Sequence, residues 1–246
     1  MTELLRFVVP TSDEVHVWWI DLNAVRDDAD DILSPDERAR AARFRHQRDR
    51  GRWTRARAAI RQLLAGYLGL PPQEIRLTAG TPAVTAIRAK PALANDPRLR
   101  FNLAHAGDRA VLAVAWEREV GIDLEPIDAG FDLPPLLRAA CTAAEIVRVE
   151  ALPPELRIEA FLGLWTVKEA YLKGLGVGVF REPRTLEVEF LADGHAIVHD
   201  PYDESDPWRW DVRLLNAGPG WVAALAVAGS GCALRRFTWA HADAAS

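Results

Sequence analysis

Residues 161–178 read FLGLWTVKEAYLKGLGVG, and apolar residues recur through this stretch at helical spacing. The spacing predicts a helix over residues 155–173, with Gly174 as its C-terminal cap. Glu169 and Lys173 are four residues apart and therefore share one face of that helix, with Trp165 one turn earlier on the same face. By themselves these residues fit either an ordinary surface ion pair or a functional pair.

The choice of lysine separates these two interpretations. Only three of the 30 basic residues are lysines, namely Lys90, Lys168 and Lys173. A surface ion pair would accept arginine, whereas a compact ammonium suits a crowded site such as a phosphate beside a metal ion. The composition therefore ranks these three lysines first among the candidate binding residues.

An acidic pair precedes the motif WTVKEAYLK of this helix by about forty residues. In the segment VGIDLE, residues 120–125, a strand would place Asp123 and Glu125 on one face, with Ile122 and Leu124 turned toward the core. Two adjacent carboxylates repel each other, and a bound cation would relieve that repulsion. Carboxylate oxygens suit Mg²⁺, although solvated acids at a strand end would have the same pattern.

Arginine is concentrated in the first third of the chain. Ten of the 24 positions from Arg38 to Arg61 are arginine, although the whole chain has a net charge of −5. This segment indicates either a solvated face or an anion site. His105, in FNLAHAGD, is predicted at a junction between a strand and a turn, where a phosphate could approach backbone N–H groups.

The remaining pattern is mixed α and β. Helices are predicted from Ser34 to about Phe44, through Trp53–Tyr67 to a stop at Gly69, and at about 132–150. Strands are predicted at 14–22, in two pieces of 100–116, at 119–126 and in five segments after residue 184.

Two parts of the pattern recur. VWWIDL at 17–22 is similar to VGIDLE at 120–125, and AHAGDRAVLAVA at 104–115 is similar to LNAGPGWVAALAVA at 215–228. The recurrence indicates two similar halves joined near residues 116–120. Chance similarity of short Ala/Val-rich strands is the alternative.

Composition bounds the class of protein. Hydrophobic residues make up 49% and charged residues 26%, which is typical of a globular domain. No apolar run approaches the roughly 20 residues of a membrane span, the first residues do not resemble a signal peptide, and two cysteines are too few for a disulfide framework. We expect a cytoplasmic protein that does not bind membranes.

The motifs become specific when they are taken in order: SPDERARAARF, RDRGRWTRARAAIR, AKP, FNLAHAG, VGIDLE and WTVKEAYLK. Together they resemble the Sfp-type 4′-phosphopantetheinyl transferases. The resemblance covers Ser34 to Lys173 and implies an α/β (α+β) fold, a pseudo-dimer of two similar halves. Each half would be a small antiparallel sheet packed by helices. We assign the halves to residues 1–117 and 118–246.

The resemblance also implies roles for the matched residues. Asp123, Glu125 and Glu169 would hold Mg²⁺, and Lys173 would contact the phosphates of coenzyme A. The remaining coenzyme A contacts would be Arg40, Arg52, Lys90, His105 and Lys168. The catalytic residues would be Asp123, Glu169 and Lys173, with Glu169 as the candidate base.

The implied reaction is transfer of 4′-phosphopantetheine from coenzyme A to a serine of an acyl or peptidyl carrier protein, as in fatty acid, polyketide and nonribosomal peptide biosynthesis. We expect a monomer with no nucleic-acid partner. Two alternatives are a Mg²⁺-dependent hydrolase of a nucleotide diphosphate and an arginine-rich module that binds nucleic acid or an acidic protein. Ala104 and Ala106 depart from the family pattern, which often has serine there, so hydroxyl contacts to phosphate are expected to be missing.

Overall fold

The computed structural model describes residues 6–25, 29–79, 90–128, 130–177, 181–203 and 209–239. The first part of the chain contains β1 (Glu14–Asp21), α1 (Ala29–Ile32), α2 (Pro35–Ala41), α3 (Gln47–Leu68), β2 (Leu77–Ala79), β3 (Pro91–Leu93), β4 (Leu99–Ala106) and β5 (Arg109–Trp116). The second part contains β6 (Val120–Pro126), α4 (Leu133–Ala140), α5 (Ala143–Glu150), α6 (Pro154–Leu175), β7 (Glu187–Phe190), β8 (His195–His199), β9 (Trp210–Leu215), β10 (Trp221–Ala228) and β11 (Ala233–Trp239).

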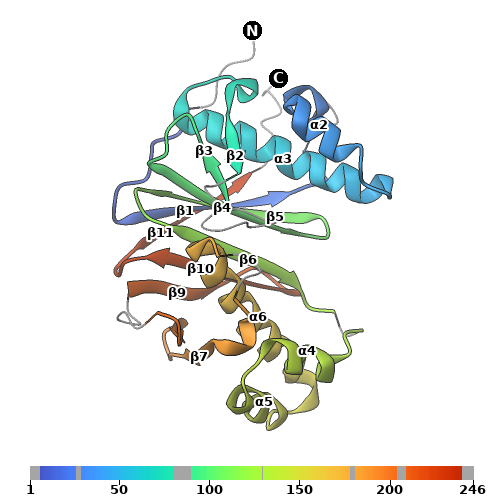
Figure 1. The fold of residues 1–246 in the computed structure, drawn as a ribbon, viewed down its shortest axis with the longest axis vertical. Coiled ribbons are helices and arrows are strands. Elements are labelled where there is room, and N and C mark those ends of the chain that lie inside the picture. Colours follow the sequence, from blue (N-terminus) through green and yellow to red (C-terminus); the bar gives the residue numbers. More distant parts are fainter. Residues whose placement is uncertain are drawn as a thin grey trace.

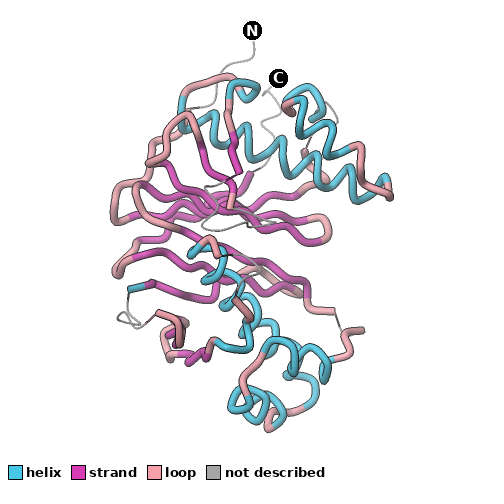
Figure 2. Tube along the Cα trace, in the orientation of Figure 1, coloured by secondary structure: helices cyan, strands magenta, loops and turns pink. Residues whose placement is uncertain are grey.

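Two sheets lie face to face at the centre of the molecule, with helices outside them (Figures 1 and 2). The first sheet has the order β11-β1-β5-β4, and the second has the order β6-β10-β9-β8-β7. Their pairings are antiparallel except for β1 with β11. The mixed α+β class expected from the sequence is confirmed.

Strand alternation divides the apolar residues into three layers. In β1 and β5, Val17, Val111 and Ala113 pack between the sheets, while Trp18 and Leu112 pack against α3. The strands β6 and β10 repeat this arrangement, and their outer face packs on α6. Each sheet therefore has one face toward the other sheet and one face toward a long helix.

The two halves share a topology, which supports the recurrence noted in the sequence. In each half the first strand pairs antiparallel with the last strand that the half contributes to that same sheet, β1 with β5 and β6 with β10. The long helices α3 and α6 both have 22 residues and both end at a glycine in the left-handed conformation, Gly69 with φ +65° and Gly176 with φ +72°.

The short helices before α3 and α6 are equivalent as well. Ser34 and Glu37 form a capping box on α2, and Thr142 and Glu145 form one on α5. Each capping-box glutamate also pairs with a buried cation at the same position along the following long helix. These pairs are Arg61 Nε with Glu37 at 2.6 Å and Lys168 Nζ with Glu145 at 2.5 Å.

One strand breaks the symmetry between the halves. The strand β11, from the end of the chain, pairs with β1, so the first sheet contains strands from both predicted halves. In the second sheet β6 remains an edge strand. The division at residues 117 and 118 therefore stays a prediction.

Three predicted helix boundaries were wrong. The helix begun at Ser34 ends at Ala41, and the region 132–150 forms two helices because Thr142 caps the second one. Gly174 lies inside α6, and the left-handed C-cap is Gly176. None of the helices in the described ranges combines the length and apolar character needed to span a bilayer.

Candidate active site

The acidic pair lies on the α6 side of the edge strand β6. Ile122 and Leu124 pack between the sheets, as the sequence predicted. Alternation therefore turns Asp123 and Glu125 to the opposite face of β6, which is the side of α6. Strand and helix approach closely because both carry glycine at the contact. A Cβ on Gly121 would lie 1.9 Å from the carbonyl oxygen of Ala170 and 2.3 Å from the nitrogen of Gly174.

This contact brings the α6 motif to the two acids. Lys173 Nζ donates to Asp123 Oδ1 at 2.5 Å, and Trp165 Nε1 donates to Glu125 Oε1 at 3.3 Å. Glu169 lies on the same part of α6 and is close enough to Asp123 and Glu125 to interact with them electrostatically. The structure thus gathers Asp123, Glu125, Glu169 and Lys173 at one place.

The three carboxyl groups are incompletely compensated. Burial raises the pKa of Glu125 and of Glu169, and the negative charge of Asp123 raises both further. Burial also raises the pKa of Asp123, and Lys173 opposes that rise. A cluster of this kind would be relieved by a bound cation.

The donor set fits a hard cation. Asp123 Oδ2 is buried and has no hydrogen-bond partner, and the cluster offers only carboxylate oxygens, which Mg²⁺ prefers. As the side chains stand, no group of three or more His, Cys, Asp or Glu residues within the described ranges forms a ready-made metal site. Lys173 occupies the other oxygen of Asp123.

His105 lies across from the acids at the end of β4. It precedes the turn at Gly107, whose φ of +53° favours glycine. Desolvation lowers the pKa of His105, and the positive charges of Lys173 and Arg57 lower it further. His105 is therefore within electrostatic reach of α3 through Arg57 and of α6 through Lys173.

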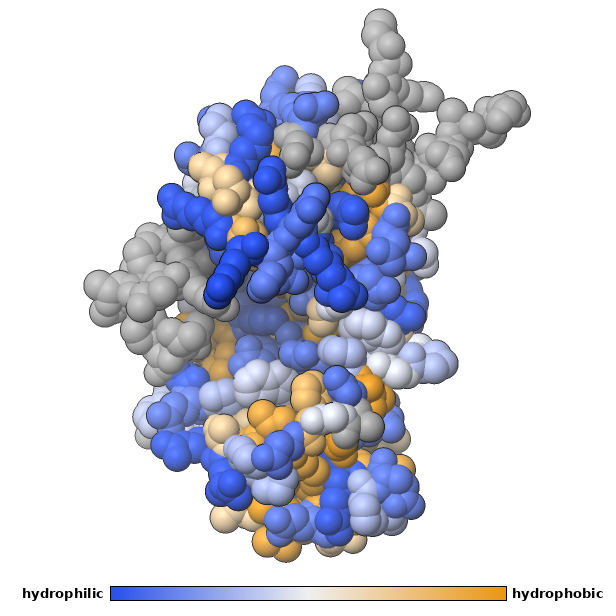
Figure 3. All heavy atoms as spheres, turned by 90° about the vertical axis from the view of Figure 1, so that its right-hand side faces the viewer, coloured by the Kyte–Doolittle hydropathy of each residue, from blue (hydrophilic) through white to orange (hydrophobic). Residues whose placement is uncertain are grey.

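Arg52 lies in a hollow of about 480 Å³ at the start of α3, with Asp108 of the turn after His105. The other residues that line it are Asn23, Gln47, Arg48, Gly51 and Arg55. Seen from this side, strongly hydrophilic side chains stand above a recessed hydrophilic area between the two halves of the molecule (Figure 3). Arg40 is exposed, and its guanidinium lies 5.6 Å from the centre of the Trp53 ring, next to Arg57.

Lys90 is engaged by protein groups. Its Nζ donates to Glu119 Oε2 at 2.7 Å and to the carbonyl oxygen of Gly174 at 3.2 Å. The structure therefore places this lysine at the end of α6, and its ammonium is already paired.

Lys168, expected as a coenzyme A contact, is engaged by protein groups in the structure. Lys168 is 0% exposed, and its Nζ donates to Glu145 Oε2 at 2.5 Å and to the carbonyl oxygen of Ala140 at 2.9 Å. It is the counterpart of Arg61, which anchors the other capping-box helix. The sequence could not show this, since Lys168 belongs to the same motif as Glu169 and Lys173.

The structure also shows on which face of β4 a serine hydroxyl at position 104 would lie. Ala104 is buried between the sheets, on the opposite face of β4 from His105. A hydroxyl group there would point away from the side of the strand where His105 lies.

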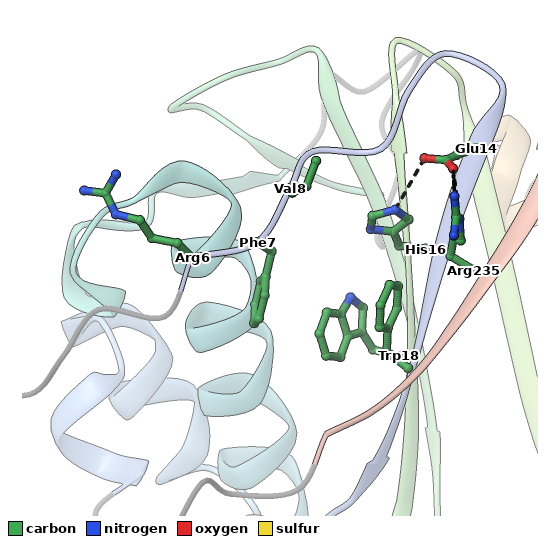
Figure 4. Close-up of a pocket in the computed structure, with 8 residues that line it drawn as sticks. Arg6, Phe7, Val8, Glu14, His16, Trp18 and Arg235 are labelled. Carbon is green, nitrogen blue, oxygen red and sulfur yellow. Dashed lines mark hydrogen bonds and ion pairs between the residues drawn. The ribbon is translucent and has the colours of Figure 1, made fainter.

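The equivalent place in the first half is closed. In the repeat of VWWIDL and VGIDLE, Ile20 corresponds to Asp123 and Trp18 to Gly121. Trp18 and Ile20 are buried on the α3 side of β1, and Trp18 stacks on Phe237 of β11 with ring centres 4.6 Å apart. Trp18 and His16 both contact the Tyr67 hydroxyl. A pocket of about 380 Å³ remains there, lined mainly by aromatic side chains and the Glu14–Arg235 ion pair (Figure 4). The first half therefore has the apolar residues Ile20 and Leu22 where the second half has Asp123 and Glu125.

Sequence reasoning missed two residues of this site. Arg57 was not distinguished from its neighbours in the arginine-rich segment, although its charge acts on His105. Trp165 was placed on the helix face of Glu169 and Lys173 without a role of its own, and it donates to Glu125. For Trp165 the signal was its helical spacing with Glu169.

The chain is similar to known proteins over most of its length. A family model described as the 4′-phosphopantetheinyl transferase superfamily matches residues 119–226, and a model for the N-terminal part of 4′-phosphopantetheinyl transferase matches residues 19–117.

Individual relatives cover most of the chain. The 4′-phosphopantetheinyl transferase HetI of Nostoc sp. is 34% identical over 89% of this chain and 90% of its own length. The 4′-phosphopantetheinyl transferase psf-1 of Bacillus pumilus is 31% identical over 71% of each chain. A solved holo-(acyl-carrier-protein) synthase from Bacillus anthracis, in complex with CoA (3′,5′-ADP), is 22% identical over 46% of this chain and 96% of its own, with a TM-score of 0.38. The chain belongs to the 4′-phosphopantetheinyl transferase superfamily.

Proposed function

We propose that this chain transfers the 4′-phosphopantetheine group of coenzyme A to a serine hydroxyl of an acyl or peptidyl carrier protein, with Mg²⁺ at the acidic cluster. Membership of the family supports the reaction. The observation that carries the assignment of the site is the convergence of Asp123, Glu169 and Lys173 from β6 and α6 opposite His105.

The residues divide by charge. His105, Arg52 and Arg57 provide the side of the site that would bind the phosphates of the nucleotide, because positive groups gather there. Lys173 would stabilise negative charge on the pyrophosphate oxygens, which is the main requirement of phosphoryl transfer. Arg40 is a candidate at the outer edge of this surface, because it is exposed.

Glu169 is the candidate for the general base. Burial and the charge of Asp123 raise its pKa, which makes it a better proton acceptor near neutral pH. The serine oxygen would form a bond to the phosphorus that bears pantetheine as its proton passes to Glu169. The bond from that phosphorus to the oxygen of adenosine 3′,5′-bisphosphate would break.

Asp123, Glu125 and Glu169 would hold Mg²⁺, which when bound would neutralise charge on the phosphoryl oxygens. Asp123 Oδ2 is the first oxygen available to it, since it is buried without a partner. Trp165 would keep Glu125 oriented through its indole N–H. We further propose that the protein acts as a cytoplasmic monomer, divided at residues 117 and 118 into a nucleotide-binding half and a metal-binding half.

Mass spectrometry of an unmodified carrier protein after incubation with coenzyme A tests the reaction. The expected result is a gain of one phosphopantetheine group on the carrier that disappears when EDTA removes divalent cations and returns with Mg²⁺. No gain across acyl and peptidyl carriers would refute the proposed function. Free phosphopantetheine without carrier modification would indicate the hydrolase instead.

The variant Glu169→Gln tests the site. We expect its turnover to fall at least about 10²-fold, within the range for loss of a general base, with little change in coenzyme A affinity. The control is Glu159→Gln, which changes an exposed glutamate of the same helix. Equal turnover in the two variants would remove Glu169 from both of its roles.

A further inference from the structure

The ammonium of Lys90 joins three parts of the chain. Lys90 lies immediately before β3, and its side chain is 15% exposed. It pairs with Glu119 in the connection between β5 and β6, and it donates to the carbonyl oxygen of Gly174 in the last turn of α6. Its aliphatic stem lies beside Gly176, whose added Cβ would be 3.8 Å from Lys90 Cβ.

A cation at this point stabilises the end of the helix for two reasons. The last carbonyl groups of an α-helix have no partner within the helix, and its C-terminus carries partial negative charge. Lys90 supplies a hydrogen bond and a positive charge to the turn that also carries Lys173. Glu119 holds the lysine there from the opposite side.

The position of α6 along its axis matters for the site. The Gly121–Gly174 contact fixes how closely α6 approaches β6. The pairing of Lys173 with Asp123 and the approach of Glu169 also depend on register, since a shift by one residue moves a side chain by about 1.5 Å along the helix. The contact of Lys90 with the last turn of α6 restrains that movement.

We propose that Lys90 is a positioning residue that holds the C-terminal end of α6, so that Glu169 and Lys173 stay aligned with Asp123, and that it does not bind coenzyme A directly. This inference rests on the proposed function for its kinetic test. It gives the lysine of the AKP motif a structural role, supported by the two protein partners of its ammonium.

The test compares Lys90→Met, Lys90→Arg and Glu119→Gln with the control Arg100→Met. Arg100 lies 3.5 Å from the other oxygen of Glu119 and, within the described residues, makes no hydrogen bond or ion pair with α6. A misplacement of about 1 Å can cost about 10²-fold in rate. We therefore expect Lys90→Met to lower kcat by at least about tenfold. The Kd of adenosine 3′,5′-bisphosphate should stay within about twofold, since no nucleotide contact is lost.

The other variants separate positioning from direct contact. Glu119→Gln should lower kcat in the same direction as Lys90→Met, Lys90→Arg should recover part of the loss, and Arg100→Met should resemble the wild type. A weaker Kd for the bisphosphate with unchanged kcat in Lys90→Met would overturn the proposal. Wild-type activity in both Lys90→Met and Glu119→Gln would overturn it as well.

A structural measurement keeps the test independent of the proposed reaction. The indole N–H of Trp165 donates to Glu125, so its NMR signal reports the alignment of α6 with β6. We expect that signal to shift in Lys90→Met and Glu119→Gln but not in Arg100→Met. If wild-type protein modified no carrier, the proposed function would fail, whereas an unshifted signal in both variants would refute the positioning role.

Discussion

Substitution of Lys168 tests whether this motif lysine stabilises the fold, as its contacts indicate, or binds coenzyme A, as the motif suggested. Its ammonium and the Glu145 carboxylate are both 0% exposed. Glu145 also accepts the backbone N–H groups of Thr142 and Val188. Lys168→Met would keep most of the volume of the side chain but leave the Glu145 carboxylate buried without its cation. Loss of one partner of a buried pair costs about 3–5 kcal/mol.

For a chain of this size, 1 kcal/mol corresponds to about 2–4 °C in Tm. Lys168→Met should therefore lower Tm by roughly 6–20 °C, measured by thermal unfolding at neutral pH. The double variant Lys168→Met/Glu145→Gln should be more stable than Lys168→Met, because it removes the unpaired charge. Coenzyme A affinity of the folded protein, measured well below Tm, should stay close to that of the wild type.

Two control variants give a large and a small loss of stability for comparison with Lys168→Met. Arg61→Met removes the equivalent cation in the first half and should destabilise the protein by a similar amount, since Arg61 is 2% exposed and paired with Glu37. Arg184→Met breaks an exposed pair with Glu182 and should change stability by less than about 1 kcal/mol. A Lys168→Met protein with unchanged Tm and at least tenfold weaker coenzyme A binding would refute the structural role.

Three further predictions concern packing, charge and pH. Gly121→Ala should destabilise the protein by about 1–3 kcal/mol or more, because the added Cβ would lie 1.9 Å from a backbone atom. Gly51→Ala should instead stabilise α3 by up to about 1 kcal/mol, because its added Cβ would meet only one side-chain atom, at 4.0 Å. Urea unfolding compares the two variants, and equal effects on the free energy of unfolding would contradict the packing argument. Arg57→Met should raise the pKa of His105, since the charge of Arg57 lowers it, and should weaken coenzyme A binding; an NMR titration with an unchanged His105 pKa would contradict this. The raised pKa of Glu125 costs no stability below its unfolded value of about 4.3, and the cost grows as pH rises through the folded value. Glu125→Gln should therefore gain stability relative to the wild type as pH rises above the unfolded pKa of about 4.3 when divalent cations are absent. A difference in Tm that does not vary with pH would exclude this cause.

The sequence alone determined the elements and the family. Periodicity predicted β6 and α6, and the alternation along β6 predicted that Ile122 and Leu124 face the core while Asp123 and Glu125 share the other face. The order of six motifs then indicated the family, because motif identity depends on local residue types. The internal repeat could also be detected, since the two halves use similar strands in the same order.

Only the tertiary structure decided the partners of the lysines. Lys90, Lys168 and Lys173 have the same chemistry, and local sequence does not determine which anion lies next to each one. The fold buries Lys168 with Glu145, places Lys90 between Glu119 and the end of α6, and leaves Lys173 at the acidic cluster. These pairings join residues that are 23, 29 and 50 positions apart. They depend on how the sheets and helices pack, which sequence periodicity does not specify.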